Sequence, residues 1–231
     1  MVLNAADRIT VTSTTTKNEF STITTKPIEV ITNGYDVTPL NTGKLDAKFT
    51  ISHIGSLLTG RNPKNLWQVL SELISENLDF KNAVQLQFAG VVSHDVLETM
   101  ISLHLEPFLK LEGYLSHKEA LKFQKKSQVL LLAEIDSEET RGIIPGKLFE
   151  YMASKRPILG IGPKGWEVSD IVTETQTGST VDYSEHSQIK KLLLEWFADY
   201  QKGKLTITSV GIEKYSRKEL TKQMVSIIPW E

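Results

Sequence analysis

The chain has 231 residues, of which 40% are hydrophobic, so it is long enough to bury the core of one large domain. Its 26 Lys and Arg residues nearly balance 28 Asp and Glu residues, and the net charge of -2 provides no global basic field for nucleic acid or an anionic membrane. The absence of cysteine excludes disulfides and thiolate metal sites, and is typical of a cytoplasmic protein.

The first 30 residues form a Thr-rich segment that does not fit the pattern of the rest. They predict one strand and one short helix before Pro27 stops the pattern, which is too little to form a core. We therefore expect residues 1–30 to be a remnant and linker of another domain.

Residues 31–210 alternate short β-branched runs with amphipathic stretches. Strands are predicted near the centre of one sheet at 49–54, 83–89, 128–132 and 157–161. Because each right-handed crossover between parallel strands needs a helix to return the chain, this alternation predicts an α/β, Rossmann-like, doubly wound parallel sheet. In residues 211–231, Ser216 precedes Glu219 in a capping-box arrangement, which predicts a terminal strap helix.

In a doubly wound sheet, ligands bind at the carboxyl ends of the strands, so the strand-to-helix turns are informative. The turn after strand 49–54 contains Gly55, Arg61 and Lys64. Glycine allows close backbone approach, and either cation at the helix start can pair with phosphate oxygens. A solvated loop with Pro63 at the helix start is the alternative interpretation.

A second turn, Arg141–Ala153, is richer in candidate groups. Pro145 suits the first turn of a helix, whose exposed N–H groups form an anion site. Glu150 follows Phe149 in a stretch that should be largely buried, so its carboxylate needs a partner. Glu150 is either an acceptor for sugar hydroxyls on the pocket floor or an ordinary exposed helix residue.

The remaining candidate residues give weaker evidence for a ligand or metal site. Ser116 is placed to cap a helix through Glu119, and a histidine at position 117 in such a first turn is usually structural. Glu134 and Asp136 resemble a metal-binding acidic pair, but no third ligand is indicated and the five histidines show no metal spacing. The sequence therefore predicts no metal site.

The ordered motifs resemble the C-terminal domain of family 4 (group 1) retaining glycosyltransferases, which have the GT-B fold of two Rossmann-like domains. The resemblance rests on Ile31–Asp36, on Gly55 with Arg61, and on Pro145–Pro157, and it covers nearly the whole chain. The opening residues Ala6–Ser13 look like the last strand and helix of the family's N-terminal domain.

The resemblance implies a parent enzyme of polysaccharide biosynthesis that transfers a hexosyl group from a nucleotide-diphosphate sugar to a saccharide or lipid-linked acceptor. It implies no cofactor and no metal, because positive side chains and a helix N-terminus stabilise the departing diphosphate. The donor is held by this domain and the acceptor by the N-terminal domain, which is missing here, so we expect the fragment alone to be inactive. The parent can still associate peripherally with a membrane surface.

The resemblance also assigns roles to individual residues. Glu150 matches the second glutamate of the family's E-x7-E motif and becomes the ribose ligand, while Arg61, with Lys64, pairs with the diphosphate. The turn from Gly113 to His117 lies along the edge of the nucleotide base. Backbone groups of the turn before Glu150 face phosphate or donor sugar, and they belong to Gly142, Ile144, Pro145, Gly146 and Lys147.

One departure from the motif concerns Gly142, which stands where the first glutamate of the motif, near the donor sugar, is usual. The acidic run from Asp136 to Glu139 is the candidate substitute. A nucleotide-sugar epimerase-like enzyme and a non-catalytic nucleotide-binding module stay open as alternatives, because fold analogy does not separate them.

Overall fold

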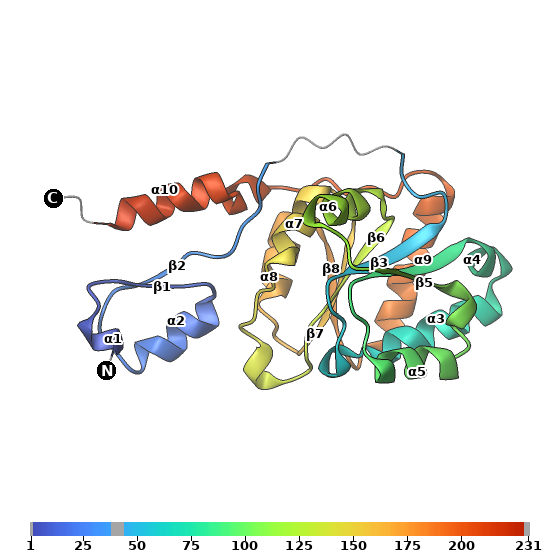
Figure 1. The fold of residues 1–231 in the computed structure, drawn as a ribbon, viewed down its shortest axis with the longest axis horizontal. Helices are drawn as coiled ribbons and strands as arrows, with labels where there is room; N and C mark the ends of the chain where they lie inside the picture. The colour runs from blue at the N-terminus through green and yellow to red at the C-terminus, as the bar shows by residue number, and fades with distance from the viewer. Residues whose placement is uncertain (1, 38–43, 229–231) are drawn as a thin grey trace.

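The computed structural model describes residues 2–37 and 44–228 and contains a six-stranded, fully parallel sheet in the order β5-β4-β3-β6-β7-β8 (Figure 1). The prediction of a doubly wound α/β sheet is confirmed, and the strands predicted near its centre occupy β3, β4, β6 and β7 to within one residue at each end. The strands are β3 (Phe49–Ile54), β4 (Val84–Ala89), β5 (Leu109–Gly113), β6 (Val129–Ala133), β7 (Ile158–Gly162) and β8 (Gly178–Asp182).

Helices cover both faces of this sheet, and β6 shows why. Val129 and Leu131 pack into the core beneath one helical layer, whereas Leu130 and Leu132 pack into the core on the opposite face. Because successive side chains of a strand point to opposite faces, a strand buried on both sides is a continuous apolar run. The helices are α3 (Lys64–Glu76), α4 (Leu78–Ala83), α5 (His94–Ser102), α6 (His117–Lys126), α7 (Lys147–Ser154), α8 (Val168–Thr175) and α9 (His186–Gln201).

The N-terminal segment forms a small unit beside the main sheet (Figure 1). It consists of α1 (Val2–Ala5), β1 (Ile9–Val11), α2 (Thr14–Ser21) and β2 (Ile28–Val30), and the two strands pair in parallel. The prediction that the pattern stops at Pro27 is wrong, because the Pro27 carbonyl accepts a hydrogen bond from the Ile9 amide at 3.0 Å and β2 follows directly.

The C-terminal segment returns from the main domain towards the N-terminal unit. After a 3-10 turn at Ile212–Tyr215, α10 (Arg217–Ile227) begins with the Ser216 side chain accepting from the Glu219 amide, as predicted. Tyr35 N donates to the Tyr215 carbonyl at 3.1 Å, and Arg217 N donates to the Tyr35 carbonyl at 2.9 Å. Residues 34–36 and the start of α10 are therefore held together, and the helix predicted after Ser216 is present.

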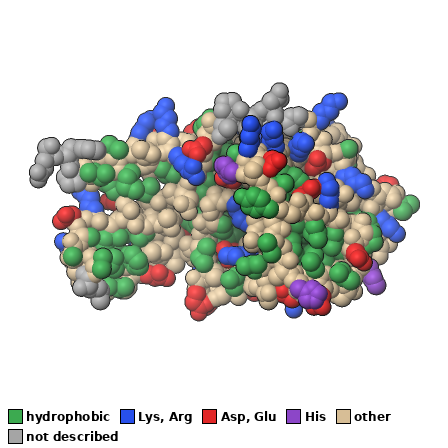
Figure 2. Space-filling model, in the orientation of Figure 1, with side chains coloured by type: hydrophobic (Ala, Val, Ile, Leu, Met, Phe, Trp, Pro, Cys, Tyr) green, Lys and Arg blue, Asp and Glu red, His purple; other side chains and the backbone are tan. Residues whose placement is uncertain are grey.

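Acidic and basic side chains are interspersed over the face of the molecule shown in Figure 2. This distribution agrees with the net charge of -2. Anion recognition on this face must therefore depend on local groups and not on a broad field. None of the helices within residues 2–37 and 44–228 is both long and apolar enough to span a bilayer.

Candidate functional site

The turns singled out from the sequence meet at one edge of the sheet, since all six strands are parallel. The chain runs outwards from β3 through β4 to β5 and then returns to β6, on the other side of β3. The loops after β3 and β6 diverge at this reversal of strand order, which is where doubly wound sheets form their ligand crevice. Arg61 comes from the first of these loops, and Glu134 begins the second.

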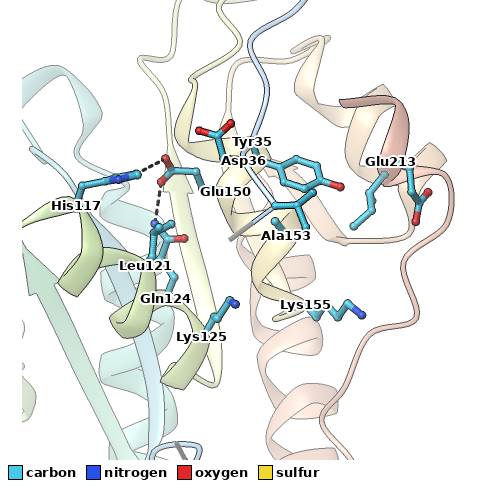
Figure 3. Close-up of a pocket in the computed structure, with 12 residues that line it drawn as sticks. Tyr35, Asp36, His117, Leu121, Gln124, Lys125, Glu150, Ala153, Lys155 and Glu213 are labelled. Atoms are coloured by element: carbon cyan, nitrogen blue, oxygen red, sulfur yellow. Dashed lines mark hydrogen bonds and ion pairs between the residues drawn. The ribbon is translucent and has the colours of Figure 1, made fainter. Parts of the chain in front are cut away.

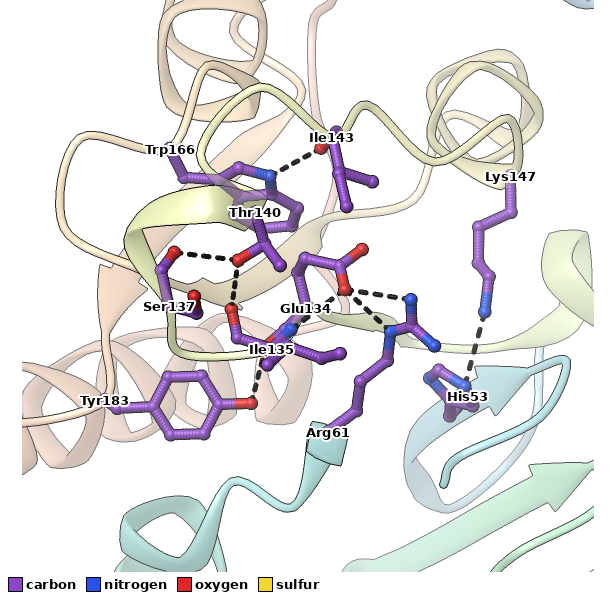
Figure 4. A network of polar contacts seen from close by, with 10 residues as sticks. All are labelled: His53, Arg61, Glu134, Ile135, Ser137, Thr140, Ile143, Lys147, Trp166 and Tyr183. Carbon is purple, nitrogen blue, oxygen red and sulfur yellow. Dashed lines mark hydrogen bonds and ion pairs between the residues drawn. The ribbon is translucent and has the colours of Figure 1, made fainter. Parts of the chain in front are cut away.

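Arg61 and Glu134 form an ion pair at this point (Figure 4). Nε and Nη2 of Arg61 donate to Oε1 of Glu134 at 2.9 and 2.8 Å, and the Ile135 amide donates to the same oxygen at 2.9 Å. The Glu134 carboxylate is 1% exposed, whereas the Arg61 side chain is 31% exposed. A carboxylate this deeply buried needs a cation. Glu134 therefore fixes Arg61 at the edge of the crevice.

The side chain of Lys147, from the start of α7, reaches the end of β3. A Cβ atom on Gly55 would lie 2.9 Å from Lys147 Nζ, and Gly55 has φ +107°, a backbone conformation that favours glycine. Lys147 Nζ lies 3.4 Å from Nε2 of His53, whose Nδ1 is 3.0 Å from the Leu131 carbonyl (Figure 4). With its Nδ1–H donated to that carbonyl, the imidazole presents Nε2 as an acceptor to the ammonium group.

Among the residues that the structure describes, no carboxylate is bonded to one cation of this cluster, Lys147. Burial, followed by the Arg61 charge, lowers the pKa of Lys147 to about 8, although Glu134 acts to raise it. Burial and the Lys147 charge lower the pKa of His53 to about 3, so the imidazole is neutral. Arg61 has Glu134 as its counter-ion, but the nearest polar partner of Lys147 is a neutral ring. The crevice is therefore suited to an anionic ligand.

Glu150 lies one helical turn beyond Lys147 on α7, so the two side chains share a face. Its Oε1 is 2.9 Å from His117 Nε2, and its Oε2 accepts from Gln124 Nε2 at 3.1 Å (Figure 3). The Glu150 side chain is 23% exposed, so it is not the ordinary exposed helix glutamate of the alternative interpretation. His117 and Gln124 both belong to α6, and together with Glu150 they line a cavity of about 380 Å³ that extends to Tyr35.

Other predicted residues are placed less centrally. Lys64 lines a separate hollow of about 360 Å³ together with Asp95 and Asp136. Helix α7 begins at Lys147 with Gly146 as its N-cap. Pro145 therefore precedes the helix, whereas the sequence predicts it in the first turn. Gly113 has φ +68° and open space around it, and Ile144 is buried.

Gly142 is packed against the N-terminal segment. A Cβ atom at this position would lie 2.6 Å from the Cβ of Thr15. The place expected for a sugar-binding glutamate side chain is thus occupied by Thr15. In the acidic run offered as a substitute, Glu138 bonds to Arg141 at 3.0 Å and Asp136 lines the hollow of Lys64.

Sequence reasoning missed the roles of His53, Glu134 and the Lys147 side chain. His53 is a titratable residue inside an apolar strand, and Glu134 directly follows the apolar run of β6, so unexpected burial was the available signal. Within the described ranges, no group of three or more His, Asp or Glu side chains is arranged to hold a metal ion.

No family model and no curated protein sequence matches this chain. Solved structures match over 96% of it. One match is a mutant of TarM from S. aureus, solved in complex with fondaparinux, α-GlcNAc-glycerol and UDP, which is 16% identical with a TM-score of 0.67. Another is the pneumococcal O-GlcNAc transferase GtfA, solved in complex with UDP and GlcNAc, which is 17% identical with a TM-score of 0.66. The chain covers only 44% of the length of each.

A third match concerns a single domain. The C-terminal domain of a glycosyl transferase group 1 family protein from Francisella tularensis is 13% identical, with a TM-score of 0.51, over 78% of this chain and 88% of that domain. At these identities the likeness establishes the fold. The main domain has the Rossmann-like fold of the C-terminal domains of GT-B glycosyltransferases.

Proposed function

We propose that this chain is the donor-binding half of a GT-B glycosyltransferase and that it binds a nucleoside diphosphate sugar. One observation carries the proposal: α7 presents Lys147 and Glu150 one turn apart, the first reaching Gly55 directly after β3 and the second lining the cavity beside α6. A phosphate group and a ribose of one nucleotide are separated by a comparable short span. A single helix therefore offers a cation and a carboxylate in the order that such a ligand requires.

The diphosphate is assigned to the crevice. Lys147 supplies a charge that no neighbouring carboxylate bonds within the described residues, and Arg61 presents the exposed part of its guanidinium from the opposite loop. At the start of α7 the Leu148 amide donates to the Pro145 carbonyl at 2.9 Å and the Phe149 amide to the Gly146 carbonyl at 3.3 Å, so the proposed diphosphate site depends on the side chains of Lys147 and Arg61. Lys64 is not needed for this arrangement.

The nucleoside is assigned to the cavity lined by Glu150 and His117. Both carboxylate oxygens of Glu150 already accept hydrogen bonds, which shows that the group is oriented as an acceptor. Ribose hydroxyls can take the place of the His117 contact on Oε1, while Gln124 keeps Oε2 fixed from below. The cavity volume of about 380 Å³ falls within the range of small-molecule sites.

The fold and the ligands bound in the similar structures support the proposal of a transfer reaction. The S. aureus and pneumococcal proteins were solved with UDP, and the latter is an O-GlcNAc transferase. For this chain we infer retaining hexosyl transfer, with Lys147 and Arg61 stabilising the departing diphosphate without a metal ion. The saccharide or lipid-linked acceptor, the N-terminal acceptor domain, a cytoplasmic location and peripheral membrane association belong to the proposal for the whole enzyme.

Titration calorimetry with UDP, GDP and ADP tests the proposal. Glu150→Ala should weaken binding of the preferred nucleotide by about 1.5 to 3 kcal/mol, the range for hydrogen bonds to a charged group. Lys64→Met is the matched control, since Lys64 faces another hollow, and it should bind as the native protein does. Native protein that binds none of the three nucleotides would refute the proposed function, and unchanged affinity in Glu150→Ala would remove Glu150 from the site.

An epimerase would use the same nucleotide site, so binding alone does not exclude it. Conversion of a nucleotide sugar to its epimer by the full-length enzyme without any acceptor would favour that alternative. A non-catalytic module would bind the nucleotide, but it would form no nucleoside diphosphate from a nucleotide sugar even when the N-terminal domain is present.

A further inference from the structure

One residue of the main domain, Glu167, binds both the N-terminal segment and the loop that leads into α7. Its Oε1 accepts from the Thr14 amide at 2.6 Å, and its Oε2 accepts from the amide and hydroxyl of Thr15 at 3.0 and 2.9 Å. Its own backbone amide donates to the Arg141 carbonyl at 2.9 Å. We call the three hydrogen bonds from Thr14 and Thr15 to the Glu167 carboxylate the docking contact.

The start of α2 is suited to this carboxylate. Helix N-termini carry unpaired N–H groups and the positive end of the helix dipole, so an anion there is stabilising. Burial raises the pKa of Glu167, but the hydrogen bonds from Thr15 and Thr14 outweigh burial and lower it. Helix α2 has eight residues, none of them buried, so its own side chains attach it only weakly.

The loop before α7 is enclosed on the opposite side by the neighbour of Glu167. Trp166 is 2% exposed and donates from Nε1 to the Ile143 carbonyl at 2.7 Å (Figure 4). Its ring lies over β7, where a Cβ atom on Gly162 would approach it to 2.3 Å. Thr15 closes the other side against Gly142. Residues 141–143 are therefore fixed between the 166–167 pair and the start of α2.

We propose that Glu167 is a positioning residue, which docks α2 against the loop before α7 and thereby sets where Lys147 stands in the nucleotide site. The second half of this statement rests on the proposed function. If one arrangement of the loop both accepts α2 and binds nucleotide, the two events favour each other by the same factor. Nucleotide should then stabilise the docking contact, and the docking contact should strengthen nucleotide binding.

Hydrogen exchange of the whole 231-residue chain without ligand tests the first half. Glu167→Gln should speed exchange of the Thr14 and Thr15 amides about tenfold or more, because the charged acceptor is lost. Gly142→Ala should do the same by pushing Thr15 away. Glu174→Gln is the matched control, since Glu174 lies on α8, the helix that directly follows Glu167, and pairs with Lys214 at 2.5 Å. Native exchange rates in both test variants would overturn the docking contact.

Exchange with UDP as the probe tests the second half. Saturating UDP should slow exchange of the Thr14 and Thr15 amides in native protein, and Glu167→Gln should bind UDP several-fold more weakly while its sheet amides exchange as before. UDP that binds without slowing these amides would overturn the coupling. A native protein that does not bind UDP, GDP or ADP would instead refute the proposed function, and the ligand-free comparison would still decide whether Glu167 docks α2.

Discussion

Lys147 should lower the stability of the protein while serving the proposed nucleotide site, and Lys147→Met separates the two effects. Methionine has a similar length and no charge, so it can fill the same space against Gly55. It removes a buried ammonium group that lies 3.4 Å from the neutral His53 ring. We expect the variant to be more stable than native protein and to bind nucleoside diphosphates more weakly.

The magnitude follows from the pKa of Lys147, which falls from its usual 10.5 to about 8 on folding. At about 1.36 kcal/mol for each pKa unit, the buried charge destabilises the fold by about 3 kcal/mol at pH 7. The unfolded chain binds more protons than the folded one between pH 8 and 10.5, so stability rises with pH in that window. This destabilisation is complete below pH 8 and disappears as the pH approaches 10.5.

Urea unfolding at pH 7 and pH 9.5 measures this effect. At pH 7 the free energy of unfolding should be higher in Lys147→Met by about 1 to 3 kcal/mol, allowing for lost packing of the lysine stem. The gain should shrink at pH 9.5. Lys164→Met, at an exposed position, should leave stability unchanged at both values.

Nucleotide affinity should change with pH in the opposite direction to stability. A ligand diphosphate restores the ordinary pKa of Lys147, so UDP affinity in native protein should fall about tenfold between pH 7 and pH 9, and Lys147→Met should show no such fall. A less stable Lys147→Met variant, or a native affinity that is constant up to pH 9.5, would refute the assignment of a buried, anion-binding lysine.

Two further predictions concern the strap and the reaction. Gly34→Ala should lower the free energy of unfolding by about 1 to 3 kcal/mol, because its Cβ would lie 2.5 Å from both Leu220 Cδ1 and the Tyr215 carbonyl oxygen. In Gly146→Ala the nearest atom to the new Cβ is 3.9 Å away, so this control should unfold in urea as the native protein does. Equal losses of stability in the two variants would contradict this packing. Residues 1–231, incubated with nucleotide sugars and saccharide or lipid acceptors, should transfer no sugar at a useful rate until the acceptor domain is added. Positioning the acceptor against the donor supplies about 7 to 11 kcal/mol of barrier reduction. Robust transfer by the chain alone would refute the half-enzyme proposal.

The sequence predicted the sheet well because its evidence was local. An apolar run such as 129–133 between polar turns has few interpretations, and its burial on both faces follows from the alternation of strand side chains. The strand at Ile28–Val30 was missed because Pro27 was taken as a stop signal, although proline removes only a donor and its carbonyl still pairs with Ile9.

The site was predicted only in part because its contacts join residues that are distant in sequence. Glu150 was singled out by its position in an apolar stretch and its ribose role stays a prediction, whereas its contacts with His117 and Gln124, which come from another helix, were not predicted. Lys64 was chosen with Arg61 for its closeness in sequence, whereas the cation at Gly55 is Lys147, 92 positions later in the chain than Gly55. The choice between two lysines depends on side-chain reach across the strand edge, which no spacing rule contains.

The different partners of the two cations bear on how a transferase would use them. Glu134 holds Arg61 in place before any ligand arrives, so Arg61 can act as a fixed donor with little reorganisation. Lys147 is bonded to no such counter-ion within residues 2–37 and 44–228, and its affinity for an anion increases with the charge of that anion. During sugar transfer the diphosphate gains negative charge as the bond to the sugar breaks, so the interaction with Lys147 strengthens on the way to the transition state. Under the proposed function, Lys147 therefore contributes to the rate of bond breaking, because its contact is stronger in the transition state than in the bound donor.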